Sequence, residues 1–288
     1  MGHWYDESRL PRYFEGKNGN DTTLRDVKRL AKLGDILHAS VTTYLGIKHK
    51  EGLVKWREAE AAEAAALKAI REGSSEADID RIFSRRAIAE AKEKTTAKSD
   101  AGTVIHALLE KFHEDPFAVS GDDQKMCYAI VDCIHENTGL SLFDDFIPEE
   151  TFCDTELGYA GMCDLHTKPE VEPWVLDYKS KDVVTDKTKG YPEQAEQVAA
   201  YAHGLGMPQA RTGNIFISRT VPAEDEPWGV KFFENKDEMA WERFRHTLML
   251  WQVSNTYGPY YDELVMVMYH DKIMAEMNTE ELENVAVS

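Results

Sequence analysis

Residues 173–182, PWVLDYKSKD, lead from an apolar block straight into a carboxylate and an ammonium group. The apolar block is typical of a buried strand. Because side chains alternate between the two faces of a strand, Asp177 and Lys179 are expected to share one face. Charges at the end of a buried strand are costly unless they are paired or bound to a metal ion. The stretch therefore predicts a charged site at the end of a central strand.

The composition is typical of a globular protein. Of the 288 residues, 42% are hydrophobic and 10% are aromatic, which is enough for a sizeable core. The sequence has no uncharged apolar run of membrane-spanning length and no signal-peptide pattern at its start, so we expect a cytoplasmic protein without a membrane partner. The four cysteines form no CxxC pair, which favours reduced thiols.

The formal net charge of -19 restricts the possible partners. Coating nucleic acid with the whole surface would require an excess of lysine and arginine. A local basic groove is still compatible with an acidic protein, because cations can be concentrated beside one site.

Helical periodicity dominates the first half of the chain. Apolar residues recur at helical spacing over 22–41, and the stretches 51–73 and 74–98 continue this pattern. Two more helices are expected, one starting near residue 100 and one over 121–137. We interpret the first 99 residues as a helical region packed on the core.

Strand periodicity follows from about residue 146. Two strands are expected around a turn at Gly158, and a third covers 174–180. A helix over 191–206 then precedes two more strands and a long helix over 237–257. This order predicts an α/β core with a helical N-terminal layer. The acidic tail is expected to be disordered.

A second carboxylate lies on the strand before Asp177. Asp164 ends the segment Gly161–Asp164, and a short hairpin would place it opposite Asp177 on the same sheet face. Two converging carboxylates with a lysine nearby form an oxygen-rich site for a hard cation such as Mg²⁺ or Mn²⁺. The acid-x-Lys triplet occurs five more times in the chain, so an Asp–Lys ion pair at a solvated strand end is the alternative.

Two helices carry further polar side chains with shared faces. His106 and Glu110 are four residues apart on one expected helix, and Gln194, Gln197 and Tyr201 share a face of another. The alternatives are a core or surface histidine and a solvated helix face.

Taken together, these segments resemble the RecB-like branch of the PD-(D/E)XK nuclease superfamily, which includes phage exonucleases. The family order is a helix histidine, a Gly-x-x-Asp strand, an Asp-x-Lys strand and a Gln-x-x-x-Tyr helix. The matching segments are Gly102–His106, Gly161–Asp164, Asp177–Lys179 and Gln197–Tyr201.

The resemblance implies a fold and its division. It implies a restriction-endonuclease-like α/β core over 100–257, with a small central mixed β-sheet flanked by helices. The helical layer over 1–99 would precede this core, and an extension over 258–288 would follow it.

The resemblance also implies roles for individual residues. One or two Mg²⁺ or Mn²⁺ ions would be bound by His106, Asp164, Asp177 and the backbone carbonyl of Tyr178. Lys179 would orient or help deprotonate the attacking water and offset charge on the phosphate. Gln197 and Tyr201 would position Lys179, the water or the DNA backbone. Weaker candidates are Glu110 and Gln194. The lysines that could form a basic rim for DNA, or only a solvated loop, are Lys181, Lys187 and Lys189.

The function implied is a metal-dependent deoxyribonuclease, most simply an exonuclease degrading linear DNA in recombination, repair or phage DNA metabolism. It would act in a bacterial cell or an infected host, with DNA and a single-strand annealing or binding protein as partners. Some members of the superfamily hold an iron–sulfur cluster with one cysteine before the nuclease core and three after it. No cysteine follows Cys163 in this chain, so no such cluster is expected. The alternatives are a catalytically silent nuclease-like subunit that binds DNA ends or a partner, and an acidic protein that mimics nucleic acid.

Overall fold

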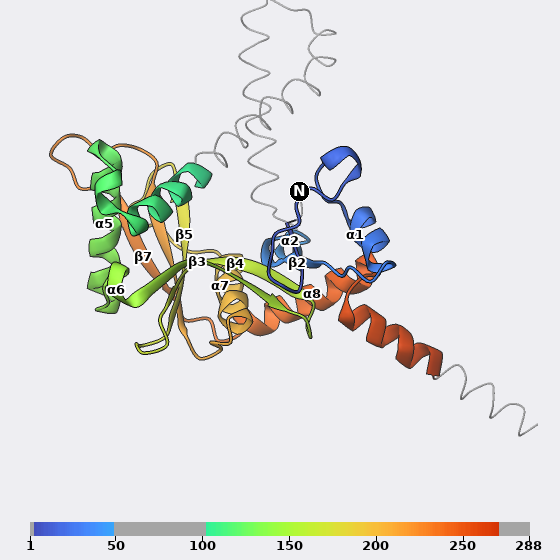
Figure 1. Cartoon of the computed structure of the whole chain (residues 1–288). Helices are drawn as coiled ribbons and strands as arrows, with labels where there is room; N and C mark the ends of the chain where they lie inside the picture. The colour runs from blue at the N-terminus through green and yellow to red at the C-terminus, as the bar shows by residue number, and fades with distance from the viewer. Residues whose placement is uncertain (1–2, 49–101, 271–288) are drawn as a thin grey trace, which may run out of the picture.

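A seven-stranded mixed sheet with helices on both faces is formed by residues 3–48 and 102–270, the parts that the computed structural model describes (Figure 1). The predicted α/β fold with a mixed sheet flanked by helices is confirmed. The helices expected over 51–73 and 74–98 and the acidic tail lie outside the described residues.

The sheet has the strand order β1-β2-β4-β5-β6-β7, with β3 paired to β4. Two neighbouring pairs, β2 with β4 and β5 with β6, are parallel, and the others are antiparallel. All five strands expected from the sequence are present, whereas β1 and β2 were not predicted. The strands are Trp4–Tyr5 (β1), His38–Ser40 (β2), Phe146–Asp154 (β3), Tyr159–Thr167 (β4), Trp174–Lys181 (β5), Arg211–Ser218 (β6) and Val230–Asn235 (β7).

The helices follow from local sequence signals. Thr23 caps α1 through a reciprocal pair of hydrogen bonds with Asp26, and Pro192 occupies the first turn of α7. The helices lie at Leu24–Ala31 (α1), Val41–Leu45 (α2), 102–114, Gly121–Thr138 (α5), Leu142–Asp145 (α6), Pro192–Gly204 (α7), Ala240–Asn255 (α8) and 259–270, with 3-10 turns at Lys17–Gly19 (η1) and Pro116–Ala118 (η2).

Two apolar clusters cover the two faces of the sheet. One cluster packs α5 and helix 102–114 on the sheet, and the other packs α1, α2, α7 and α8 on it. In β5, Leu176 and Tyr178 belong to the α5 cluster and Val175 to the α7 cluster, so the predicted alternation holds. The charged residues Asp177 and Lys179 therefore belong to the α7 face.

The predicted helix over 22–41 is wrong in its second half. α1 ends at Ala31, and Gly34 has a φ of +85°, a left-handed conformation that glycine adopts readily. Residues His38–Ser40 then form β2 and pair in parallel with the start of β4. The described part of the N-terminal layer is therefore mixed rather than helical.

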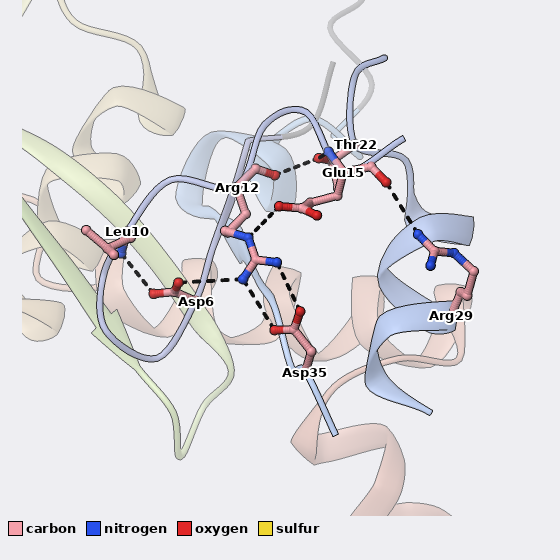
Figure 2. A network of polar contacts seen from close by, with 7 residues as sticks. All are labelled: Asp6, Leu10, Arg12, Glu15, Thr22, Arg29 and Asp35. Atoms are coloured by element: carbon pink, nitrogen blue, oxygen red, sulfur yellow. Dashed lines mark hydrogen bonds and ion pairs between the residues drawn. The ribbon is translucent and has the colours of Figure 1, made fainter. Parts of the chain in front are cut away.

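Arg12 holds the N-terminal loops together (Figure 2). Its guanidinium donates to Glu15 at 2.5 Å and to Asp35 at 3.0 Å, and it lies 3.7 Å from Asp6. The hydrogen bonds to Glu15 and Asp35 raise the pKa of Arg12 above its ordinary value. This network fixes the segment before β2, the strand that lies between β1 and β4 in the sheet.

Candidate metal-binding site

The site lies where two strands separate on one edge of β4. β3 pairs along the whole of β4 on one edge, while the other edge pairs with β2 at Tyr159–Ala160 and with β5 at Leu165–His166. Asp164 is the first residue beyond the last pair with β5, and the continued register would place it opposite Asp177. Its carboxylate accepts the backbone N–H of Tyr178 at 2.8 Å. Where β4 and β5 separate, the Asp164 carboxylate thus accepts the N–H of Tyr178 in place of a backbone carbonyl.

Glu149 lies opposite Asp164 on the other side, between the pairs Pro148–Leu165 and Glu150–Cys163. Its φ of +52° is uncommon for a residue with a side chain. Glutamate and aspartate from adjacent strands therefore meet at a single level of the sheet.

The side chains of the β3–β4 hairpin switch from one face of the sheet to the other near Glu149 and Asp164. Phe152 and Cys163 pack in the α7 cluster, whereas Phe146 and Leu165 pack in the α5 cluster. Residues an even number of positions apart share a face in regular strands, so the backbone must rotate between them. The left-handed conformation of Glu149 lies in this interval. The rotation coincides with the two carboxylates of the site.

His106 completes a group that could hold a metal ion. One ligand atom each from His106, Glu149 and Asp164 lie within 4.8 Å of one another, and His106 Nδ1 is 3.5 Å from Asp164 Oδ1. A cavity of about 10 Å³ adjoins the group, at the lower limit for one water-sized occupant. One imidazole and two carboxylates are a donor set that divalent cations accept. The prediction of a metal site with His106 and Asp164 is therefore supported, with the identity of the ion open.

The charges of this group perturb one another. Burial lowers the pKa of His106, but the hydrogen bond and charge of Asp164 outweigh it and raise the pKa to about 9. Burial, followed by the negative charge of Asp164, raises the pKa of Glu149 to about 7. Crowded carboxylates of this kind favour a bound cation, because a cation removes their mutual repulsion.

Asp177 forms the second half of the site, on the α7 face. Its buried carboxylate accepts from three donors: Lys179 Nζ at 2.6 Å, Gln197 Nε2 at 3.1 Å and Asn214 Nδ2 at 3.1 Å. Gln197 Nε2 also donates to Tyr201 Oη at 2.6 Å. Burial raises the pKa of Asp177, and the Lys179 ammonium opposes this rise. Gln197 thus contacts Asp177, the ion-pair partner of Lys179, and the predicted positioning roles of Gln197 and Tyr201 remain predictions.

The two halves are neighbours but not one ligand group. Among the described residues, the group of ligand atoms within 4.8 Å contains Glu149 and leaves Asp177 out. The charge of Asp177 nevertheless contributes to the raised pKa values of both His106 and Glu149. The predicted ligand roles of Asp177 and of the Tyr178 carbonyl remain predictions.

Close packing explains why a glycine occupies position 161, the first residue of the Gly-x-x-Asp segment. A Cβ at this position would lie 2.9 Å from the buried ring of Phe152 and 3.3 Å from Tyr201 Cε1. A side chain would therefore force Phe152 or Tyr201 away from the strand that carries Asp164.

The weaker candidates have more ordinary surroundings. Glu110 lines the small cavity beside the metal-binding group. Gln194 accepts the backbone N–H of Tyr191 at 2.9 Å, so it caps the start of α7. Lys181 lies beside the loop that carries Lys187 and Lys189, and its Nζ is 3.4 Å from the Lys189 carbonyl oxygen. Their roles in binding DNA remain predictions.

Sequence analysis missed Glu149 and Asn214. Extending the expected hairpin around Gly158 places Glu149 opposite Asp164, so the strand register was the available signal. Asn214 interrupts an apolar strand, and parallel pairing places it beside Asp177. Asn214 is a buried polar residue in a buried strand, the pattern that identified Asp177, whereas most of β3 around Glu149 is half-buried.

Comparison with known proteins leaves the family open. No family model matches the chain, and no curated protein matches it. A solved structure described as "Crystal structure of SSO0001" is similar to it, with 13% identity and a TM-score of 0.28, over 70% of this chain and 86% of that chain. This likeness is too weak to support a conclusion about fold or function.

No helix within residues 3–48 and 102–270 is both long enough and apolar enough to cross a membrane.

Proposed function

We propose that this protein is a metal-dependent deoxyribonuclease that acts as an exonuclease on linear DNA. The observation that carries the proposal is the position of a group that could hold a metal ion, His106, Glu149 and Asp164, next to the ion pair of buried Asp177 with half-buried Lys179 on the adjoining strand. A bound cation and a positioned ammonium can both offset charge that develops on a phosphodiester, and the two lie at the same break in the sheet.

Mg²⁺ or Mn²⁺ is the proposed ion, because two of the three donors are carboxylate oxygens. His106, Glu149 and Asp164 would hold it, with Asp177 as a further donor if its ion pair with Lys179 opens. When bound, such an ion lowers the pKa of a coordinated water and stabilises charge on the phosphate.

The protein side chains supply the remaining functions. The Lys179 side chain is 24% exposed and its Nζ lies 2.6 Å from Asp177, so its ammonium can serve both Asp177 and an incoming phosphate. Gln197 and Asn214 hold the Asp177 carboxylate from two sides, which fixes the orientation of the pair. Lys179 would thereby hold the attacking water or a phosphate oxygen at a defined position.

The proposal is tested with end-labelled linear single-stranded DNA, linear duplex and closed circular DNA, each with Mg²⁺, Mn²⁺ or EDTA. Wild type is compared with Asp177→Asn and Lys179→Ala. The matched control is Lys236→Ala, because Glu234 at the end of β7 and the exposed Lys236 just after it form the same acid-x-Lys pair at 3.2 Å. We expect metal-dependent loss of linear DNA that both site variants lack and the control retains.

Other outcomes would change the proposal in defined ways. Digestion in EDTA, or digestion retained by both site variants, would refute the site. Cutting of the circle would replace exonuclease with endonuclease action. DNA binding without cutting would favour the catalytically silent subunit, and binding to a DNA-processing protein but not to DNA would favour the nucleic-acid mimic.

A further inference from the structure

Tyr191 is an exposed aromatic residue at the rim of the proposed site. Its side chain is 62% exposed, and none of the ring–ring contacts among the described residues involves it. The Lys181 ammonium lies over its ring, 5.0 Å from the centroid, and 4.5 Å from the centroid of Phe216. One face of the Tyr191 ring therefore carries a cation while much of the ring is open to solvent.

The ring is held in place by its backbone. The N–H of Tyr191 donates to Gln194 at the start of α7. The preceding Gly190 packs so closely on Phe233 that a Cβ there would lie 2.9 Å from the ring. Lys231 donates to the carbonyl of Thr188 at 2.8 Å, which fastens the loop to β7. A backbone that is already ordered where it carries the ring lowers the conformational entropy lost when a ligand stacks there.

The position of the ring follows the path from the charged pair. Asp177, Lys179 and Lys181 are every second residue of β5 and so lie on one face. At about 3.3 Å per residue, Lys181 lies about 13 Å beyond Asp177. A nucleic acid backbone lying along these lysines would bring a base to Tyr191 within about four nucleotides of the cut, at about 3.4 Å per stacked nucleotide.

We propose that Tyr191 and Lys181 form a stacking platform for an unpaired nucleobase of the strand that is cut. Single-strand binding sites combine cations that contact the backbone with aromatic rings on which bases stack. A base paired inside a duplex offers no free face to such a ring, so the proposal specifies single-stranded substrate at the site. It rests on the proposed nuclease function and adds the recognition of a base.

The cap of α7 does not explain the exposed ring. The capping hydrogen bond uses the backbone N–H of Tyr191 and the side chain of Gln194, so any residue except proline could make it. A Tyr191→Ala variant therefore keeps this hydrogen bond and removes the ring together with its contact to Lys181.

The test is binding of a fluorescent single-stranded oligonucleotide of mixed sequence, measured by anisotropy in EDTA so that no cutting occurs. Tyr191→Ala is expected to raise Kd by roughly fivefold to 150-fold, which corresponds to about 1–3 kcal/mol of base stacking. Tyr191→Phe should retain wild-type affinity within about threefold, because it keeps the ring. Phe117→Ala is the matched control, since Phe117 is an 88% exposed aromatic residue on η2.

A fluorescent adenine analogue moved along the oligonucleotide locates the contact. One position should be quenched by wild type and by Tyr191→Phe but not by Tyr191→Ala. Equal affinity of wild type and Tyr191→Ala, or wild-type binding to duplex alone, would overturn the platform while leaving a nuclease in place. If wild type neither binds nor cuts any DNA, both the platform and the nuclease function are wrong.

Discussion

Replacing Glu149 with glutamine should stabilise the metal-free protein and weaken its response to metal. The carboxyl of Glu149 has its pKa raised from 4.5 to about 7 by burial and by the charge of Asp164. An acid with a raised folded-state pKa destabilises the folded state as pH rises from its unfolded pKa to its folded pKa. This penalty is absent below about pH 4.5 and complete above about pH 7.

The magnitude follows from the pKa. Converted in full, the rise to about 7 corresponds to about 3 kcal/mol at neutral pH. Solvent reaches the half-buried carboxyl and screens it, so we expect Glu149→Gln to gain about 1–2 kcal/mol. Saturating Mn²⁺ should reverse the order, because an ion present at a hundredfold its Kd adds about 2.7 kcal/mol to the wild type. The variant has lost one ligand and should gain less.

The assay is thermal unfolding in EDTA and in Mn²⁺ at about pH 4 and about pH 8. The control is Glu150→Gln on the same strand, whose carboxylate accepts from His166 at 2.8 Å. Removing that contact should lower stability in EDTA and leave the gain from Mn²⁺ intact. A Glu149→Gln variant less stable than wild type at about pH 8 in EDTA, or one that gains as much from Mn²⁺, would refute the assignment of Glu149 to the cation site.

Two further predictions concern α7. Gly204→Ala should cost about 1–3 kcal/mol in thermal unfolding, because its Cβ would lie 2.1 Å from the buried ring of Phe152. Adding Phe152→Leu should recover part of this loss, and an unchanged melting temperature for the single variant would contradict the packing. Gln197→Ala should slow DNA cleavage about 10–100-fold at saturating DNA, because it removes the donor that orients Asp177. Tyr201→Phe keeps that donor and should slow cleavage less, so the opposite order would show that Gln197 does not act through Asp177.

Local patterns predicted the core of the fold well. The alternation in β5, the turn at Gly158 and the helix over 191–206 depend on residues close in sequence, and the structure has each of them. Strands β1 and β2 could not be recognised this way, because two or three residues carry no periodicity. β1 pairs with β2, more than 30 residues later, and β2 pairs with Tyr159–Ala160. Gly34 was a readable stop signal within the expected helix over 22–41.

Local patterns likewise identified some residues of the site but not others. Asp164, Asp177 and His106 could be selected from sequence because each is a polar residue at a recognisable place in an apolar element. Glu149 depends on the register of a hairpin and on a left-handed backbone conformation. The register can be read from the expected hairpin around Gly158, whereas the left-handed conformation and the approach of His106 depend on the folded chain.

The hydrogen bond from Tyr178 to Asp164 gives the site a built-in spectroscopic reporter. The peptide proton of Tyr178 is bonded to a side-chain carboxylate at 2.8 Å, whereas most amide protons of a central strand are bonded to backbone carbonyls. Its chemical shift and its exchange rate with solvent deuterium therefore depend directly on the charge and position of that one carboxylate. In isotopically labelled protein, this single resonance reports whether an ion occupies the site, without substrate and without a dye.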